Sequence, residues 1–273
     1  FQKLRSHIPL LAIFDYLYYR ADDAGAEYPM RAESQKLFLD FFKEPAESPR
    51  RQREGIYNAR IFGPPGKRVQ IILLDTRYFR GPLNVKPREA GRSNRYLPSP
   101  DTSVTLLGET QWQWLGEQLR VPADVRIIAS SIQVISAEHD SEKWANLPHE
   151  RDRLFKLIRD TSAHGVVFVS GDVHRGEISM LDAGVGYPLH DLTSSGMTEG
   201  SVAKVKFPDW PNRQRMGTVD WTTNFGVIEF DWSAKDPLIR LQIRDGAGDV
   251  CLQKKVRLSE LKPAPGGGAR PGK

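Results

Sequence analysis

The segment 166–179, VVFVSGDVHRGEIS, constrains the fold more than any other stretch of the sequence. A run of apolar, mostly β-branched residues ends in a Ser-Gly pair, which is typical of a buried strand that runs into a functional edge. Asp172 and His174 then follow, two positions apart. Because alternate side chains of an extended backbone point the same way, this spacing predicts that both project into one cleft.

The side chains of Asp172 and His174 are two of the groups that a metal site or an acid/base site needs. A purely structural interpretation has about equal support: in it, Asp172 caps a turn and His174 is a hydrogen-bonded core histidine. Single Asp-x-His matches are common by chance, so the residue pattern alone leaves both interpretations open.

Strand and helix patterns alternate around this motif. Apolar residues recur at helical spacing in the segments 31–42, 110–119 and 150–162. Strand patterns occupy residues 8–14, 55–62, 68–75 and 125–132. A Gly-Pro-Pro-Gly turn joins the second and third of these strands into a predicted hairpin. This alternation predicts an α/β layered fold.

The C-terminal third has a different pattern, because helical spacing stops after residue 179. Strand patterns there cover residues 225–232, 238–243 and 250–258, which predicts an added antiparallel sheet. The last residues, 261–273, are rich in Pro and Gly and predict a disordered tail. We therefore expect one domain over residues 1–260.

A second polar cluster, Asp75, Arg77 and Arg80, follows the apolar strand VQIILL. Functional side chains often gather at such a strand end. Arginine forks bind phosphate oxygens in pairs, so these residues favour an anion-binding role. Surface ion pairing remains the alternative for at least one of the two arginines.

His139 lies in a loop among acidic residues, Glu138, Asp140 and Glu142. It is a candidate acid or substrate contact, and the alternative is a solvated charged loop. The Ser194-Ser195 pair before Gly196 lacks the G-x-S-x-G pattern of a nucleophile elbow, so we reject a serine hydrolase.

Composition narrows the function classes further. The single cysteine, Cys251, excludes an internal disulfide and any multi-cysteine metal cluster, so a metal here needs His and carboxylate ligands. The net charge of +5 is spread along the chain, which makes nucleic acid an unlikely partner except as a phosphodiester substrate. No apolar run approaches the roughly 20 residues of a membrane helix.

Five segments share the order of the motifs of one known family. They are AGAEYPMRAESQKLFLDFF (24–42), SPRRQREGIYNARIFGPPGKRVQIILLDTRYFRGPL (48–83), SSIQVISAEHDSEKWANLPHERDRLF (130–155), SGDVHRGEIS (170–179) and DLTSSGMTEGS (191–201). Together they resemble the PhoD-like alkaline phosphatases of the metallophosphoesterase superfamily, and the resemblance covers nearly the whole chain up to the tail.

The resemblance implies a four-layer α/β/β/α sandwich that hydrolyses phosphate mono- or diesters at a metal site on the sheet edge. Asp15, Asp172 and His174 become metal ligands, and Arg77 or Arg80 becomes a phosphate contact, beside His139 as the loop candidate. The implied cofactors are divalent or trivalent ions of the calcium, iron or zinc class. The implied partner is a small-molecule phosphate ester, and the family suggests export to the periplasm or the extracellular space.

The sequence departs from the family at its first motif. Where the family reads W-D-D-H-D-Y-G, residues 14–20 read F-D-Y-L-Y-Y-R, so Asp15 is kept while Tyr16 and Leu17 replace an aspartate and the histidine. Leucine neither binds a metal nor transfers a proton. Two further family segments, a Cys-containing strand end and a G-D-N-I-Y motif, would precede residue 1. We therefore expect an N-terminally incomplete sandwich with impaired hydrolysis. The alternative is a non-catalytic relative that keeps the fold and an anion pocket.

Overall fold

The computed structural model describes residues 8–15, 23–86, 96–198 and 210–263. The α-helices in this part are α2 (Arg31–Phe41), α3 (Gly108–Arg120) and α4 (Pro148–Asp160). The strands are β1 (Asn58–Phe62), β2 (Val69–Leu73), β3 (Asn84–Val85), β4 (Tyr96–Leu97), β5 (Val125–Ala129), β6 (Val166–Ser170), β7 (Gly176–Leu181), β8 (Leu189–Ser194), β9 (Arg215–Val219), β10 (Asn224–Asp231), β11 (Leu238–Asp245) and β12 (Val250–Arg257). Short 3-10 helices occupy Pro49–Arg51, Trp144–Asn146 and Leu258–Leu261.

Most strands form one mixed sheet of seven in the order β1-β2-β5-β6-β8-β7-β9. The four neighbours β2, β5, β6 and β8 run parallel, and the flanking strands pair antiparallel. Parallel neighbours need a crossover connection, which α3 provides between β2 and β5 and α4 provides between β5 and β6. The α/β class and the β1–β2 hairpin predicted from the sequence are confirmed.

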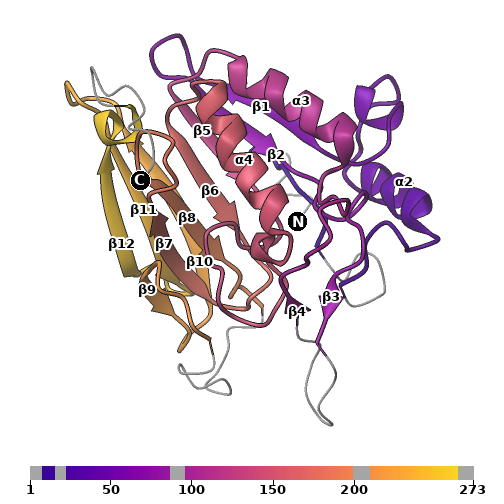
Figure 1. Ribbon diagram of the computed structural model, residues 1–273. Helices are drawn as coiled ribbons and strands as arrows, with labels where there is room; N and C mark the ends of the chain where they lie inside the picture. The colour runs from indigo at the N-terminus through magenta and orange to yellow at the C-terminus, as the bar shows by residue number, and fades with distance from the viewer. Residues whose placement is uncertain (1–7, 16–22, 87–95, 199–209, 264–273) are drawn as a thin grey trace.

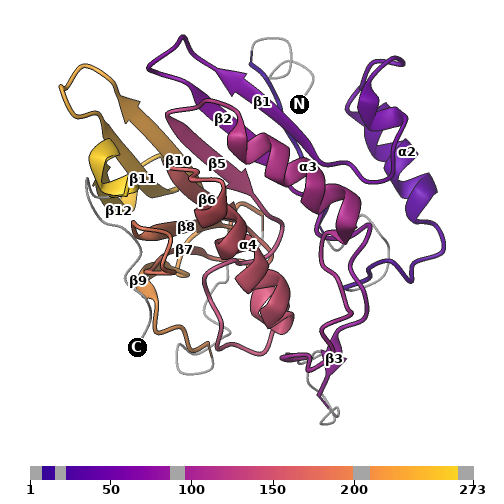
Figure 2. The ribbon, with the colours of Figure 1, turned by 45° about the horizontal axis from the view of Figure 1, so that its top comes forward.

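Helices cover one face of the large sheet. Figures 1 and 2 show α3 and α4 lying across β2, β5 and β6, with α2 on the side of the molecule remote from β12. Trp112, Leu115 and Leu119 of α3 and Leu154 and Ile158 of α4 are buried against the sheet. These residues repeat at three- and four-residue spacing, so each helix presents a single apolar stripe to the core.

The C-terminal strands β10, β11 and β12 form the predicted antiparallel sheet, which packs against β7, β8 and β9. The two sheets approach closely at two glycines. A Cβ on Gly176 would lie 2.5 Å from Ile243, and one on Gly217 would lie 2.7 Å from Leu252. Glycine at these positions therefore permits the sheet contact. The four-layer arrangement of the sandwich stays a prediction.

Two details differ from the sequence-based expectations. Residues 8–15 form no strand, and Phe14 instead packs its ring 4.8 Å from that of Phe38. The helix α2 is present as predicted, but Leu37 and Phe41, two of the apolar residues at helical spacing that predict its packed face, are each 60% exposed. An apolar run predicts burial only where another element covers it, and no described element covers these two side chains.

Other expectations fall outside the described residues, including Tyr16, Leu17 and most of the predicted tail. No described helix combines the length and apolarity that a membrane span requires.

A buried carboxylate joins α4 to the start of α3. Glu150 accepts hydrogen bonds from the backbone N–H of Leu106 at 2.5 Å, the Thr105 hydroxyl at 2.8 Å and the Trp112 indole at 2.9 Å. These donors are buried or partly buried, so each needs this acceptor.

Glu150→Ala should lower the free energy of unfolding by about 2 to 4 kcal/mol, because it leaves several buried donors without a partner. Urea unfolding followed by circular dichroism measures this loss. Glu109→Ala is the matched control, since its ion pair with Arg153 is solvent-exposed and contributes about 0 to 1 kcal/mol. Equal losses in the two variants would contradict the structural role of Glu150.

Candidate active site

The carboxyl ends of the parallel strands meet at one edge of the large sheet, and the sequence motifs lie there. Residues 75–80 follow β2, residues 130–136 follow β5, and residues 171–175 follow β6. A small cavity of about 290 Å³ at this edge is lined by residues including Asp15, Ser131, Gly171 and Ser194. Ligands of open α/β sheets bind outside the carboxyl ends of the strands, so this edge is the candidate site.

Asp172 and His174 lie in the loop between β6 and β7, and their backbone is not extended. The strand ends at Ser170, and the two residues have φ angles of 74° and 53°. The prediction that both side chains project together from an extended strand end is therefore wrong in its backbone geometry. Left-handed backbone at two residues other than glycine costs about 1 to 2 kcal/mol each and is often found at functional sites.

The ends of β6 and β8 hold this loop in place. The backbone N–H of His174 donates to the Ser195 hydroxyl at 3.2 Å, and the Ser195 N–H donates to the carbonyl of Arg175 at 3.1 Å. Ser195, considered in the sequence only as a nucleophile, here positions the motif loop.

Asp75 has a structural role at the end of β2. Its buried carboxylate accepts the backbone N–H groups of Ile56 at 2.8 Å, Arg77 at 3.0 Å and Tyr78 at 2.9 Å. Burial raises the pKa of Asp75, and the three hydrogen bonds oppose that shift. The carboxylate thereby fixes the turn that carries Arg77 into the site.

Arg77 and Arg80 are both buried beside Glu142. Glu142 lies 2.5 Å from Nη1 of Arg77 and 3.1 Å from Nε of Arg80. The ion-pair distances are short, but the guanidinium nitrogens of Arg77 and the carboxylate oxygens of Glu142 make no well-aligned hydrogen bond in the part of the chain that the structure describes. The pairing of these arginines is thus a buried one, whereas the sequence suggested a surface pair.

The remaining acidic groups surround Arg77. Asp15 lies 3.9 Å from Nη2 of Arg77, and its side chain is 42% exposed. The carboxylates of Glu142, Asp172 and Asp15 hold the pKa of Arg77 above its ordinary value against the effect of burial. Burial raises the pKa of Asp172 well above 3.8, and Glu142 adds to the rise while Arg77 opposes it. The site is an acidic corner with one central guanidinium.

The carboxylate chemistry of this corner suits a hard cation, but the described side chains do not assemble a metal site. Within residues 8–15, 23–86, 96–198 and 210–263, no three Asp, Glu, His or Cys side chains lie close enough to hold an ion. Asp15, Asp172 and His174 reach the same edge of the sheet without forming such a group. The structure therefore does not test their assignment as ligands.

His139 is buried rather than placed in a solvated loop. Its ring stacks on Trp210 with centroids 4.6 Å apart, and Nε2 lies 2.9 Å from Oε1 of Gln133. Because the amide of Gln133 donates to Glu177 and Thr193, its Oε1 accepts, and Nε2 of His139 carries the proton. Burial lowers the pKa of His139 well below 6.5, so a role as a general acid has no support from this geometry.

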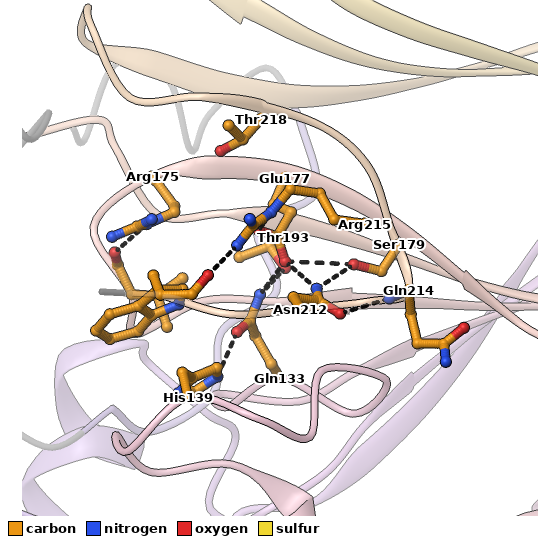
Figure 3. Close-up of polar contacts among 12 residues, drawn as sticks. Gln133, His139, Arg175, Glu177, Ser179, Thr193, Asn212, Gln214, Arg215 and Thr218 are labelled. Carbon is orange, nitrogen blue, oxygen red and sulfur yellow. Dashed lines mark hydrogen bonds and ion pairs between the residues drawn. The ribbon is translucent and has the colours of Figure 1, made fainter. Parts of the chain in front are cut away.

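Figure 3 shows the buried polar network that contains Gln133. Its centre is Glu177, which accepts from Gln133 at 3.1 Å, Asn212 at 2.7 Å and Arg215 at 2.5 Å. The sequence patterns did not point to Glu177 as a site residue. Its only signal was a charged residue in an alternating strand directly after the motif glycine, Gly176.

Asp172→Asn should stabilise the protein at pH 8 and leave its stability unchanged at pH 4. The folded state binds the Asp172 proton more tightly than the unfolded chain, so stability falls as the pH rises above the ordinary value of 3.8. Thermal unfolding from pH 4 to pH 8 measures the effect. Asp101→Asn is the control, because hydrogen bonds from Ser103 lower the pKa of that surface carboxylate. An equal midpoint for wild type and Asp172→Asn at pH 8 would contradict the burial of the charge.

Comparisons with known proteins agree with this fold. Alkaline phosphatase D of Bacillus subtilis (strain 168) is 27% identical over 128 residues, covering 42% of this chain and 21% of that protein. A solved structure described as "Structure of PhoD" matches with a TM-score of 0.59 and 18% identity, covering 92% of this chain and 55% of that one. The chain thus spans about half or less of the length of these relatives.

The match to a family model extends over most of the motifs. The model described as "PhoD-like phosphatase" covers residues 13–234, which include Asp15, Arg77 and the GDVH motif. The family suggests phosphoester hydrolysis, and it confirms the resemblance in the sequence. The family model matches more than half of the length of this chain, and the chain therefore belongs to the PhoD-like phosphatase family.

Proposed function

We propose that this chain has the site of a metal-assisted phosphoesterase that acts on small phosphate mono- or diesters. The observation that carries the proposal is Asp172 of the GDVH motif, a buried carboxyl group whose electrostatic neighbours are three acidic residues and one basic residue: Glu142, Arg77, Asp15 and Asp23. Concentrated negative charge at the carboxyl edge of a parallel sheet favours a bound cation. In phosphoesterases such cations stabilise the charge that develops on the phosphoryl oxygens.

The chain's own residues contribute position and charge. Asp75 fixes the turn that carries Arg77, and Ser195 fixes the loop that carries Asp172 and His174. Arg77 offsets part of the repulsion between the carboxylates, which keeps them together in a folded site. Pre-positioned charge of this kind lowers the reorganisation that a charged transition state requires.

A second candidate function is supported by a specific observation. Leu17 replaces the family's histidine, and Arg77 and Arg80 are already ion-paired with Glu142. A non-catalytic relative that keeps the fold has these features, and its anion pocket would need a cation other than these two arginines. The two candidate functions predict different results. An impaired phosphoesterase should regain hydrolysis when the family residues are restored, whereas a non-catalytic relative should not.

We expect wild-type protein to hydrolyse p-nitrophenyl phosphate and its bis ester slowly or not at all, with calcium, iron(III) or zinc supplied in turn. The reason is Leu17, which has no donor atom. The double change Tyr16→Asp and Leu17→His should raise the rate by at least about tenfold, because a positioned general acid or base contributes roughly 10² to 10⁴.

Addition of Asp172→Asn to the double variant is the matched control, and it should remove the gained activity. A fast, EDTA-sensitive rate in the wild type would refute the expected impairment. A folded double variant with no turnover in any metal would favour the non-catalytic relative.

A further inference from the structure

Arg175 is the arginine of the GDVHRG segment, and among the described residues it forms no ion pair, although Glu177 and Asp220 are its acidic neighbours. Arg77 and Arg80, the expected phosphate contacts, are both ion-paired with Glu142. Arg175 directly follows His174 and lies in the same loop at the carboxyl edge of the sheet. Of these three arginines, it is the one without an ion pair among the described residues.

The guanidinium of Arg175 is held from two sides. Nε donates to the carbonyl of Val173 at 3.3 Å, and Cζ lies 4.6 Å from the ring centroid of Trp210, as expected for a cation–π contact. Figure 3 shows Arg175 beside the Glu177 network. The side chain is thus pre-oriented before any ligand binds.

The two terminal nitrogens of Arg175 have hydrogen-bonding capacity left. Across the described residues they donate no hydrogen bond and form no ion pair. Both nitrogens remain in contact with solvent, although the residue as a whole is only 3% exposed. A fixed fork with two unused donors matches two oxygens of a tetrahedral oxyanion.

The aromatic support of Arg175 is itself fixed. The carbonyl of Trp210 accepts from Nη2 of Arg215 at 2.8 Å, and Arg215 is ion-paired with the buried Glu177 at 2.5 Å. Asn212 ties the same segment to Glu177 at 2.7 Å. The strand β7 therefore holds Trp210 in place, and Trp210 holds Arg175.

Charges of both signs surround Arg175. Glu177 and Asp220 are its acidic neighbours, and Arg215 is a basic neighbour that is ion-paired with Glu177. An anion here would therefore be bound by the unused donors of the guanidinium fork rather than by a positive field.

We propose that Arg175, supported by Trp210, is an anion-binding residue that receives two oxygens of a phosphate group at the candidate site. The choice of a phosphate ligand rests on the proposed function. The role differs from that expected of Arg77 and Arg80, because those two arginines are ion-paired with Glu142, whereas Arg175 forms no ion pair among the described residues.

Binding of inorganic phosphate to the full chain in EDTA buffer tests the proposal without turnover. Isothermal titration calorimetry should show saturable binding to wild type that Arg175→Gln weakens by about tenfold or more, the effect of losing charge-assisted hydrogen bonds. Arg175→Lys keeps the charge but not the fork, so its affinity should lie between the two. Arg213→Gln is the matched control on the neighbouring segment, since Arg213 is exposed and paired with Glu138, and it should bind like wild type.

Changes at Trp210 test the supporting contact. Trp210→Phe keeps an aromatic face and should retain most of the affinity, whereas Trp210→Leu should lose it while the melting temperature confirms folding. Equal phosphate affinity in wild type and Arg175→Gln, or no saturable binding to wild type, would overturn the proposal. Phosphate binding that depends on Arg175, together with a folded Tyr16→Asp and Leu17→His variant that gains no hydrolytic activity, would support it and count against the proposed function alone.

Discussion

The position of Glu142 between Arg77 and Arg80 is the interaction on which the site depends. It joins the end of β2 to the loop after β5. No local sequence pattern predicts that these two segments are in contact. Removing one member of a buried ion pair leaves an uncompensated charge, which destabilises a protein by about 3 to 5 kcal/mol. Arg77 offsets part of the charge of the acidic corner around Asp172, and Arg80 offsets part of the charge of Glu142.

A second tie, centred on Glu177, works in parallel on the other side of the motif loop. Its carboxylate joins β7 to Gln133 after β5 and to the segment that begins β9. The GDVH loop therefore has two buried carboxylates as neighbours, Glu142 near Asp172 and Glu177 near Arg175, and each is held by arginine. Left-handed backbone of this kind persists where the surrounding structure fixes it.

Sequence reasoning identified the periodic elements because their signal is local. The helices α3 and α4 and the hairpin β1–β2 have apolar spacing that packing then uses directly. The apolar run before Phe14 gave the same signal without a strand partner, and no strand formed. The candidate residues were located at the correct edge of the sheet. Their contacts were not predictable, because Glu142 is distant in sequence from Arg77 and sits in a polar loop with no periodic pattern.

The left-handed backbone at Asp172 and His174 restricts which amino acids the motif tolerates, apart from any chemistry. Asn, Asp, His and Gly adopt this conformation with the least steric conflict, whereas β-branched side chains clash with the backbone there. A valine at either position would be selected against even in a relative that had lost all activity. Persistence of Asp and His in this loop is therefore weak evidence of catalysis by itself, and a drift to Asn or Gly would be the earliest sign that the chemistry had been given up while the fold was kept.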